Sequence, residues 1–270
     1  MALLMIIGFV VPGLLTLAIS LGTPYGAMPQ ANIDTTKFIE IGQSSYFWRV
    51  LSFTLGISAV IAALNAVLAY PLAMFLARSD SKWVGICYLI TFTPLAVGMN
   101  MLTIGWLIML GQSGVVNGLL MSAGIIDSPL TLAYGIGAVV IGLAHISFTF
   151  MVLPLESVIR NIHPSLERAA TSLGAPKWRV FLTITLPLSF EGIAAGMLIV
   201  FMQSCGAFVI PLLLGGTDTV MLPVAIWEQM SVANDRAGAA ALSVALTVVA
   251  LVVLAVQLKY FNKLPAPEHA

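Results

Sequence analysis

The segment Ser165-Leu-Glu-Arg-Ala-Ala-Thr-Ser-Leu-Gly-Ala-Pro-Lys-Trp-Arg-Val-Phe-Leu-Thr-Ile-Thr-Leu-Pro187 is a compact polar stretch between two long apolar ones. Its residue spacing predicts two short amphipathic helices that are joined at Gly174-Ala175-Pro176. A membrane protein that places such a segment on one side of the bilayer offers a docking surface to a soluble partner. The segment is therefore the best indication in this sequence of what the chain does.

The composition of the whole chain places it in a membrane. Of its 270 residues, 60% are hydrophobic and only 8% are charged, whereas soluble domains carry roughly 25% charged residues. The formal net charge is zero, so nucleic-acid binding has no electrostatic basis. The two cysteines, Cys87 and Cys205, lie inside apolar runs and are interpreted as packing residues, with neither a disulfide nor a metal site expected.

Six apolar stretches are long enough to cross a bilayer core of about 30 Å as helices. We therefore predict an all-α integral membrane fold that forms a single transmembrane domain over residues 1–270. Backbone groups in lipid must be paired within the segment, which favours helices over short alternating strands. No basic residue precedes the first stretch, so a membrane span is preferred to a secretory signal. The predicted spans are about 2–21, 51–77, 83–110, 132–155, 190–214 and 239–260.

The basic residues near the span ends predict the orientation. Six spans divide the eleven Lys and Arg residues into a set of eight on one side and a set of three on the other, and the larger set is expected in the cytoplasm. Both termini and a loop over residues 156–189 then lie inside. The set of eight contains Arg78, Lys82, Arg160, Arg168, Lys177, Arg179, Lys259 and Lys263, and the set of three contains Lys37, Arg49 and Arg236.

Polar residues inside the predicted spans are candidates for an aqueous path, because polar groups in hydrocarbon are costly and usually face a bundle interior or a cavity. Asn100 follows Pro94 and Gly98, and Gln203 and Ser204 precede Gly206, so these polar residues lie where a helix bends or opens. The alternative for each is a hydrogen bond between helices. Glu228, in the last outer loop, is a candidate for contact with a cationic solute or with an outer partner.

The polar segment has a defined predicted shape. Leu166, Ala169, Ala170 and Leu173 form one apolar stripe at helical spacing, and the small alanines allow another surface to approach closely. Gly174 suits the left-handed residue that ends a helix. An interfacial helix lying on lipid headgroups is the alternative, but such a helix favours larger apolar side chains than alanine.

Residues 168–187 resemble the signature loop of binding-protein-dependent ABC importer permeases. In that family the pattern is Glu-Ala-Ala, three residues, Gly, nine residues, Ile, one residue and Leu-Pro. Here Ala169-Ala170, Gly174, Ile184 and Leu186-Pro187 match it at every spacing. The family's Glu position holds Arg168, with Glu167 one residue earlier, which leaves open which of the two makes the polar contact with the ATPase.

Three further stretches resemble the spermidine/putrescine importer branch, and specifically its first permease subunit. The resemblance covers most of the chain from about residue 48 onward. It implies that the solute is a polyamine or a related small cation. The stretches are Tyr70-Pro-Leu-Ala-Met-Phe-Leu-Ala77, Gly124-Ile-Ile-Asp-Ser-Pro129 and Gly206-Ala-Phe-Val-Ile-Pro-Leu-Leu-Leu-Gly-Gly216.

The resemblance also implies a set of partners in a bacterial inner membrane. These are a pair of ATP-binding subunits, which hold the ATP and Mg²⁺, a second permease subunit of the same or a different kind, and a periplasmic solute-binding protein. The chain itself is expected to be non-catalytic and without a cofactor, since no Gly-rich phosphate-binding motif followed by Lys is present. An ion-coupled secondary transporter and a non-transporting membrane assembly subunit are the alternatives; the former requires membrane-buried carboxylates.

Overall fold

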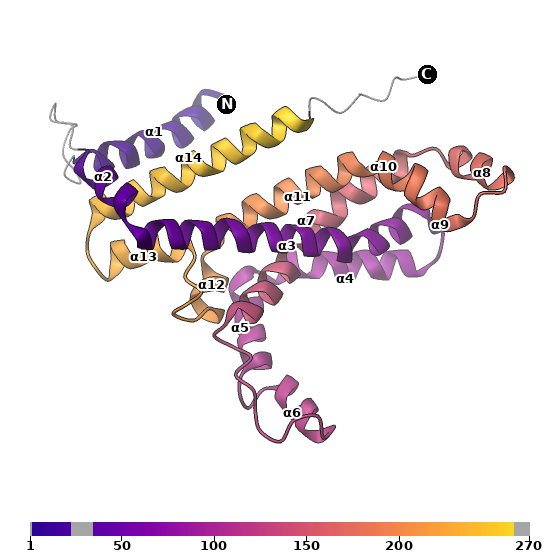
Figure 1. Ribbon diagram of the computed structural model, residues 1–270, viewed down its shortest axis with the longest axis horizontal. Coiled ribbons are helices and arrows are strands. Elements are labelled where there is room, and N and C mark those ends of the chain that lie inside the picture. The colour runs from indigo at the N-terminus through magenta and orange to yellow at the C-terminus, as the bar shows by residue number, and fades with distance from the viewer. Residues whose placement is uncertain (1, 23–34, 262–270) are drawn as a thin grey trace.

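The computed structural model describes residues 2–22 and 35–261, and every regular element in these two ranges is a helix (Figure 1). Two predictions from the charge pattern, on Lys263 and on the position of the C-terminus, concern residues outside the described ranges. The helices are α1 (Ala2–Ser20), α2 (Thr36–Gln43), α3 (Ser45–Arg78), α4 (Trp83–Val97), α5 (Met99–Leu110), α6 (Val115–Ser122), α7 (Ile136–Asn161), α8 (Pro164–Ser172), α9 (Lys177–Val180), the π-helix η1 (Phe181–Thr185), α10 (Leu186–Leu188), α11 (Phe190–Cys205), α12 (Val209–Leu214), α13 (Leu222–Ser231) and α14 (Arg236–Phe261).

Four helical segments, one of which contains both α5 and α6, are long and apolar enough to cross a membrane, and a fifth candidate is a bent pair. The four are Ser45–Arg78, Met99–Ser122, Ile136–Asn161 and Arg236–Val256, and the pair is Lys177–Leu188 with Phe190–Cys205. The fold is therefore all-helical and of the membrane-spanning kind, as the composition predicts.

Helices α3, α7 and α11 form the core, and α11 approaches α7 through glycines. Gly192 and Gly196 lie one turn apart on α11, in the small-xxx-small arrangement that lets membrane helices touch backbone to backbone. A Cβ on Gly192 would lie 3.0 Å from the Cα of Leu155. Buried apolar side chains such as Ile61 and Val200 fill the space around this contact.

The predicted third span is interrupted at Gly98. This residue has φ +83° and ψ 144°, a conformation that ends α4 and starts α5 in a new direction. Figure 1 shows α5 and α6 leaving the long axis of the bundle, whereas α4 runs beside α3. The predicted fifth span is likewise interrupted, because α11 ends at Cys205 and α12 begins at Val209. The bends expected next to Asn100 and Gln203 are thus present.

Short helices occupy the stretches between the first and second, the third and fourth, and the fifth and sixth predicted spans. These are α2, α6 and α13. In α13, Pro223 stands in the first turn, where its missing N–H costs nothing. At this end of the bundle Lys37 Nζ of α2 contacts Asp235 Oδ2 at 3.0 Å, just before α14. The opposite end carries α8 and α9 (Figure 1).

Candidate functional site

The polar hairpin, defined here as residues 163–185, projects from one end of the bundle between α7 and α11 (Figure 1). It begins with His163, whose Nδ1 accepts a hydrogen bond from the backbone N–H of Ser165 at 3.3 Å. Pro164 occupies the first helical turn of α8, where its missing N–H costs nothing. The chain therefore starts a new helix directly after α7 ends.

Gly174 makes the turn of the hairpin. Its φ is +86°, the left-handed conformation that glycine adopts without steric cost. The N–H of Ala175 donates to the carbonyl of Ala170 at 3.1 Å, and the N–H of Gly174 donates to the carbonyl of Thr171 at 3.0 Å. These two bonds form the Schellman motif, which confirms the predicted helix end and fixes the angle between α8 and α9.

The apolar stripe of α8 faces outward. Leu173 is 88% exposed and Leu166 is 46% exposed, and Ala169 is exposed between them. Across the turn, Trp178 is 60% exposed. Large apolar side chains gathered at this level of exposure on a helical hairpin mark a surface that another protein or a membrane covers.

Glu167 lies on the opposite side of α8 and is bound to the body of the chain. Its Oε1 accepts a hydrogen bond from the Nη2 of Arg78, the last residue of α3, at 3.1 Å. The same oxygen accepts a second bond from Oγ1 of Thr185 in η1, at 3.0 Å. One carboxylate oxygen thus connects α8 with two other elements.

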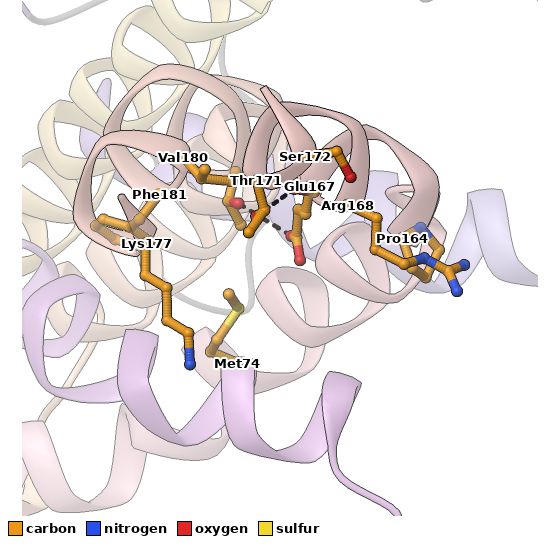
Figure 2. Close-up of a pocket in the computed structure, with 10 residues that line it drawn as sticks. Met74, Pro164, Glu167, Arg168, Thr171, Ser172, Lys177, Val180 and Phe181 are labelled. Carbon is orange, nitrogen blue, oxygen red and sulfur yellow. Dashed lines mark hydrogen bonds between the residues drawn. The ribbon is translucent and has the colours of Figure 1, made fainter. Parts of the chain in front are cut away.

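Arg168 points away from this connection and borders a hollow of about 870 Å³. Figure 2 shows the Arg168 and Lys177 side chains extending to different sides of the hollow, with Met74 on its far wall. Both cations are exposed. The remaining lining residues are Pro164, Glu167, Thr171, Ser172, Val180, Phe181 and Thr185.

The last part of the predicted loop passes into the fifth predicted span through a π-helical turn. The π-helix η1 contains Ile184, and α10 contains Leu186 and Pro187. Residues Lys177–Leu188 and Phe190–Cys205 meet at 59°. Ser189 at this bend shares a hydrogen bond of 2.8 Å with the hydroxyl of Tyr70 on α3. The polar hairpin therefore joins α11 through a sharp bend at Ser189.

A second polar cluster joins three helices at the same end. Tyr88 of α4 donates its hydroxyl hydrogen to Glu156 of α7 at 2.7 Å, and Arg160 donates from Nε to the same carboxylate at 2.9 Å. Arg160 Nη2 also donates to the carbonyl of Leu76 in α3 at 3.3 Å. The buried Glu156 is thus a paired charge near the end of α7.

The four candidate pathway residues differ in how far the chain's own helices cover them. Asn100 is exposed on α5, and Glu228 is half-buried on α13. Gln203 is half-buried, with an Oε1 atom that is buried and has no hydrogen-bond partner. Ser204, in contrast, is 1% exposed, and its Oγ also has no partner. Of these four, Ser204 is the one enclosed by the chain's own helices.

His145 pairs with a residue that the sequence does not connect to it. Trp106 of α5 donates from Nε1 to His145 Nδ1 at 2.9 Å, and the two rings meet edge to face. Asn65 of α3 donates from Nδ2 to Oγ of Ser147 at 3.4 Å. Both pairs join helices, so the structure places His145 and Asn65 in interhelical contacts, as expected for polar side chains inside a bundle.

Comparison with known proteins agrees with this arrangement. The profile of the family described as "Binding-protein-dependent transport system inner membrane component" matches residues 69–263. The spermidine/putrescine transport system permease protein PotB of Escherichia coli (strain K12) is 33% identical over 203 residues, which are 75% of this chain and 74% of that protein.

Solved structures also resemble this fold. A bacterial ABC transporter involved in the import of the acidic polysaccharide alginate contains a chain with a TM-score of 0.79 at 19% identity, over 98% of this chain and 93% of that one. The alginate transporter in complex with a pentasaccharide-bound periplasmic protein contains one with a TM-score of 0.74 at 20% identity, over 95% and 89%. At these identities the likeness concerns the fold alone.

Proposed function

Because this chain belongs to the family of binding-protein-dependent transport system inner membrane components, we propose that it is one permease subunit of an ATP-binding-cassette importer. In this proposal it forms half of the translocation pathway with a second permease subunit, of the same or a different kind. A periplasmic binding protein delivers the solute, and a pair of ATP-binding subunits drives the cycle. The chain itself transports and does not hydrolyse ATP.

The uncovered apolar stripe of the polar hairpin carries this proposal. Leu166, Ala169 and Leu173 lie on a rigid helix whose end is fixed at Gly174, and a membrane anchor or an ion-coupled carrier does not need such a surface. A soluble subunit that seats α8 would cover these side chains. The coupling residues of the proposal are Glu167, Arg168, Ala169, Ala170, Gly174, Ile184, Leu186 and Pro187.

The hairpin is suited to transmit motion because it is stiff at each joint. Its turn is held by two backbone hydrogen bonds, and η1 continues through α10 to the bend at Ser189. A flexible linker would absorb a displacement of the ATP-binding subunits, whereas this element passes it to α11 and α7. Nucleotide-driven closure then switches the pathway between its two sides, the mechanism of alternating access.

We assign a polyamine or a related small cation as the solute. The support is sequence similarity to PotB, which is named for spermidine and putrescine transport. Asn100, Gln203 and Glu228 are the proposed pathway residues, whereas Ser204, the fourth candidate from the sequence, is enclosed by the chain's own helices. Gln203 offers a buried oxygen without a partner, which is an acceptor for an ammonium group.

The proposed topology has six membrane crossings in the bacterial inner membrane, with both termini and the polar hairpin in the cytoplasm. In this arrangement α1, the combination of α4 and α5, and the combination of α11 and α12 complete the crossings. The excess of Lys and Arg on the hairpin side supports this orientation.

An ion-coupled secondary transporter is the rival function, and it requires a carboxylate within the membrane. Among the described residues, Glu156 is the buried carboxylate, and Arg160 and Tyr88 bind it at the end of the bundle. This placement favours a structural ion pair over an ion-binding site.

The test is to co-express the chain with its genomic neighbours and to measure co-purification of an ATP-binding subunit and uptake of radiolabelled spermidine or putrescine. The Gly174→Asp variant should release that subunit or uncouple ATP hydrolysis from uptake. Gly174→Asn is the matched control, since asparagine has the same size and tolerates the left-handed conformation. Normal co-purification and normal uptake by Gly174→Asp would contradict the proposal.

A further inference from the structure

The charges of the polar hairpin are unequally engaged. Glu167 is its one acidic residue, and its side chain is 26% exposed and bound to Arg78 and Thr185. Arg168 and Lys177 are exposed, and the structure gives neither side chain a hydrogen bond or an ion pair with any described residue. The exposed charges of the hairpin are therefore cations, whereas its carboxylate binds other parts of the same chain.

The two cations border one hollow from different sides. This hollow lies between α8, α9 and the end of α3 (Figure 2). The hydroxyl-bearing Thr171 and Ser172 line the same hollow. Arg78 already compensates Glu167, so the field inside the hollow is set by the two unpaired cations. Side chains with acceptor oxygens and negative charge fit this lining, because each cation can donate charge-assisted hydrogen bonds to such a group.

From this geometry we propose that Arg168 and Lys177 each receive an acidic side chain of the ATP-binding subunit at this hollow, while Glu167 is a positioning residue that holds α8 against α3. The inference rests on the proposed function and specifies the chemistry of that contact. It assigns opposite roles to the neighbouring residues 167 and 168. The partner surface that meets α8 is accordingly acidic where it enters the hollow.

The connection through Glu167 explains why its own charge is not available to the partner. If the carboxylate left Arg78, the guanidinium would lose this acceptor, and its Nε is already buried without a hydrogen-bond partner. Breaking a partly buried ion pair from one side leaves a charge without compensation, which is the unfavourable arrangement. Glu167 therefore stabilises the contact of α8 with α3 and η1 and does not contact the partner.

Charge reversal at each cation tests the proposal in the assembled transporter. Retention of the ATP-binding subunit during purification would be measured at rising NaCl concentration for Arg168→Glu and Lys177→Glu. Both variants should lose roughly ten-fold in retention, and wild-type retention should fall with salt. Arg179→Glu is the matched control, because Arg179 is an exposed cation on the same hairpin that does not line the hollow; it should behave as wild type.

Glu167 is tested by a different readout. Glu167→Gln should retain the ATP-binding subunit but reduce solute uptake per ATP hydrolysed, by roughly two- to thirty-fold. The double charge exchange Arg78→Glu with Glu167→Arg should restore part of that ratio. Permease abundance in membranes and thermal unfolding of each variant establish that the chains are folded.

The possible outcomes distinguish contact with the ATP-binding subunit from contact with lipid and from failure of the proposed function. Release of the ATP-binding subunit by Glu167→Gln, with normal retention by Arg168→Glu, would overturn the assignment. Equal losses for Arg168→Glu, Lys177→Glu and Arg179→Glu would also overturn it, because the cations would then act through anionic lipid. If no ATP-binding subunit accompanies even the wild-type chain, the proposed function fails first. Suppression of Arg168→Glu by a reversed acidic residue in the partner would establish the contact.

Discussion

Gly196 of α11 lies so close to Met151 of α7 that a Cβ built on the glycine would stand 2.5 Å from the Met151 sulfur. Real side chains do not approach to that distance, so a residue larger than glycine must displace the Met151 side chain, and its Cβ would also lie 3.3 Å from the Met151 carbonyl oxygen. The contact joins the two helices that flank the polar hairpin. The packing of α7 against α11 at this point therefore favours a residue without a side chain at position 196.

Gly196→Val is expected to destabilise the chain by about 1–3 kcal/mol, the usual cost of overpacking a well-filled core. Thermal unfolding in detergent, followed by tryptophan fluorescence, measures the change. Gly56→Val is the matched control, since a Cβ on Gly56 of α3 would meet no atom within 4 Å. Equal effects of the two substitutions would show that helix propensity, rather than the close approach, accounts for the loss.

Local chemistry in the sequence was enough to predict several joints of the fold. Gly174, followed by Ala175 and Pro176, predicts a helix end, and Gly98 predicts a bend beside Asn100, because glycine at these places permits a backbone conformation that other residues avoid. Both are present. The apolar stretches also predict the helices themselves, since hydrophobicity over about 20 residues is a strong signal.

The remaining features depend on contacts between distant parts of the chain. Arg78 and Glu167 are separated by 89 positions, and helical spacing can show which residues share a face but not which partner that face meets. The direction of α5 and α6 away from the bundle likewise depends on contacts between residues that are far apart in the sequence. The π-helical turn at Phe181–Thr185 leaves no pattern in the sequence, so a regular helix was the natural expectation there.

Ser204→Ala should change stability, whereas Gln203→Ala should change transport. Ser204 is enclosed and its Oγ has no hydrogen-bond partner, so removing the hydroxyl should leave transport unchanged and raise stability by about 1 kcal/mol. Gln203 is half-buried, and its loss should weaken solute transport. Uptake kinetics and thermal unfolding of both variants separate the two effects. Unchanged affinity and rate in Gln203→Ala would remove it from the pathway.

Asn117→Ala should loosen the stretch between α5 and α7. The Asn117 side chain donates to the carbonyls of Gly111 and Leu130 at 3.0 and 2.9 Å, and its Oδ1 accepts from the N–H of Leu130 at 2.9 Å. Loss of these buried bonds should cost about 1–3 kcal/mol. Hydrogen exchange at residues 111–131 measures the effect. Asn117→Asp, which keeps the acceptor and loses the donors, should show an intermediate or similar loss; no change in exchange for either variant would contradict this role.

The ion pair between Lys37 and Asp235 should make stability depend on pH at both extremes. A backbone hydrogen bond from Gly238, and then Lys37, lower the pKa of Asp235 below 3.8. The hydrogen bond and charge of Asp235 raise the pKa of Lys37 above 10.5. Asp235 therefore stabilises the fold above pH 3.8, and this is lost as pH falls through its folded pKa. Lys37 stabilises it below pH 10.5, and this is lost as pH rises through its folded pKa.

The measurement is the difference in unfolding temperature between wild type and Asp235→Asn. It should be positive and constant near neutral pH and should shrink below about pH 4. Its size should be small, since the two side chains are 37% and 33% exposed and solvent screens such pairs. If the difference in unfolding temperature were the same at pH 7 and pH 3, the charge of the Asp235 carboxylate would make no contribution to stability.

The length of α3 has a mechanical consequence. Its 34 residues form a rod of about 51 Å, which carries Phe47 at one end, against α13 and α14, and Arg78 at the other, against α8. A rotation of about 5° around the middle of such a rod moves its two tips by about 2 Å in opposite directions. The two ends of α3 therefore move together. A small tilt of the helix at Arg78 displaces Phe47 without any rearrangement of the helix between them.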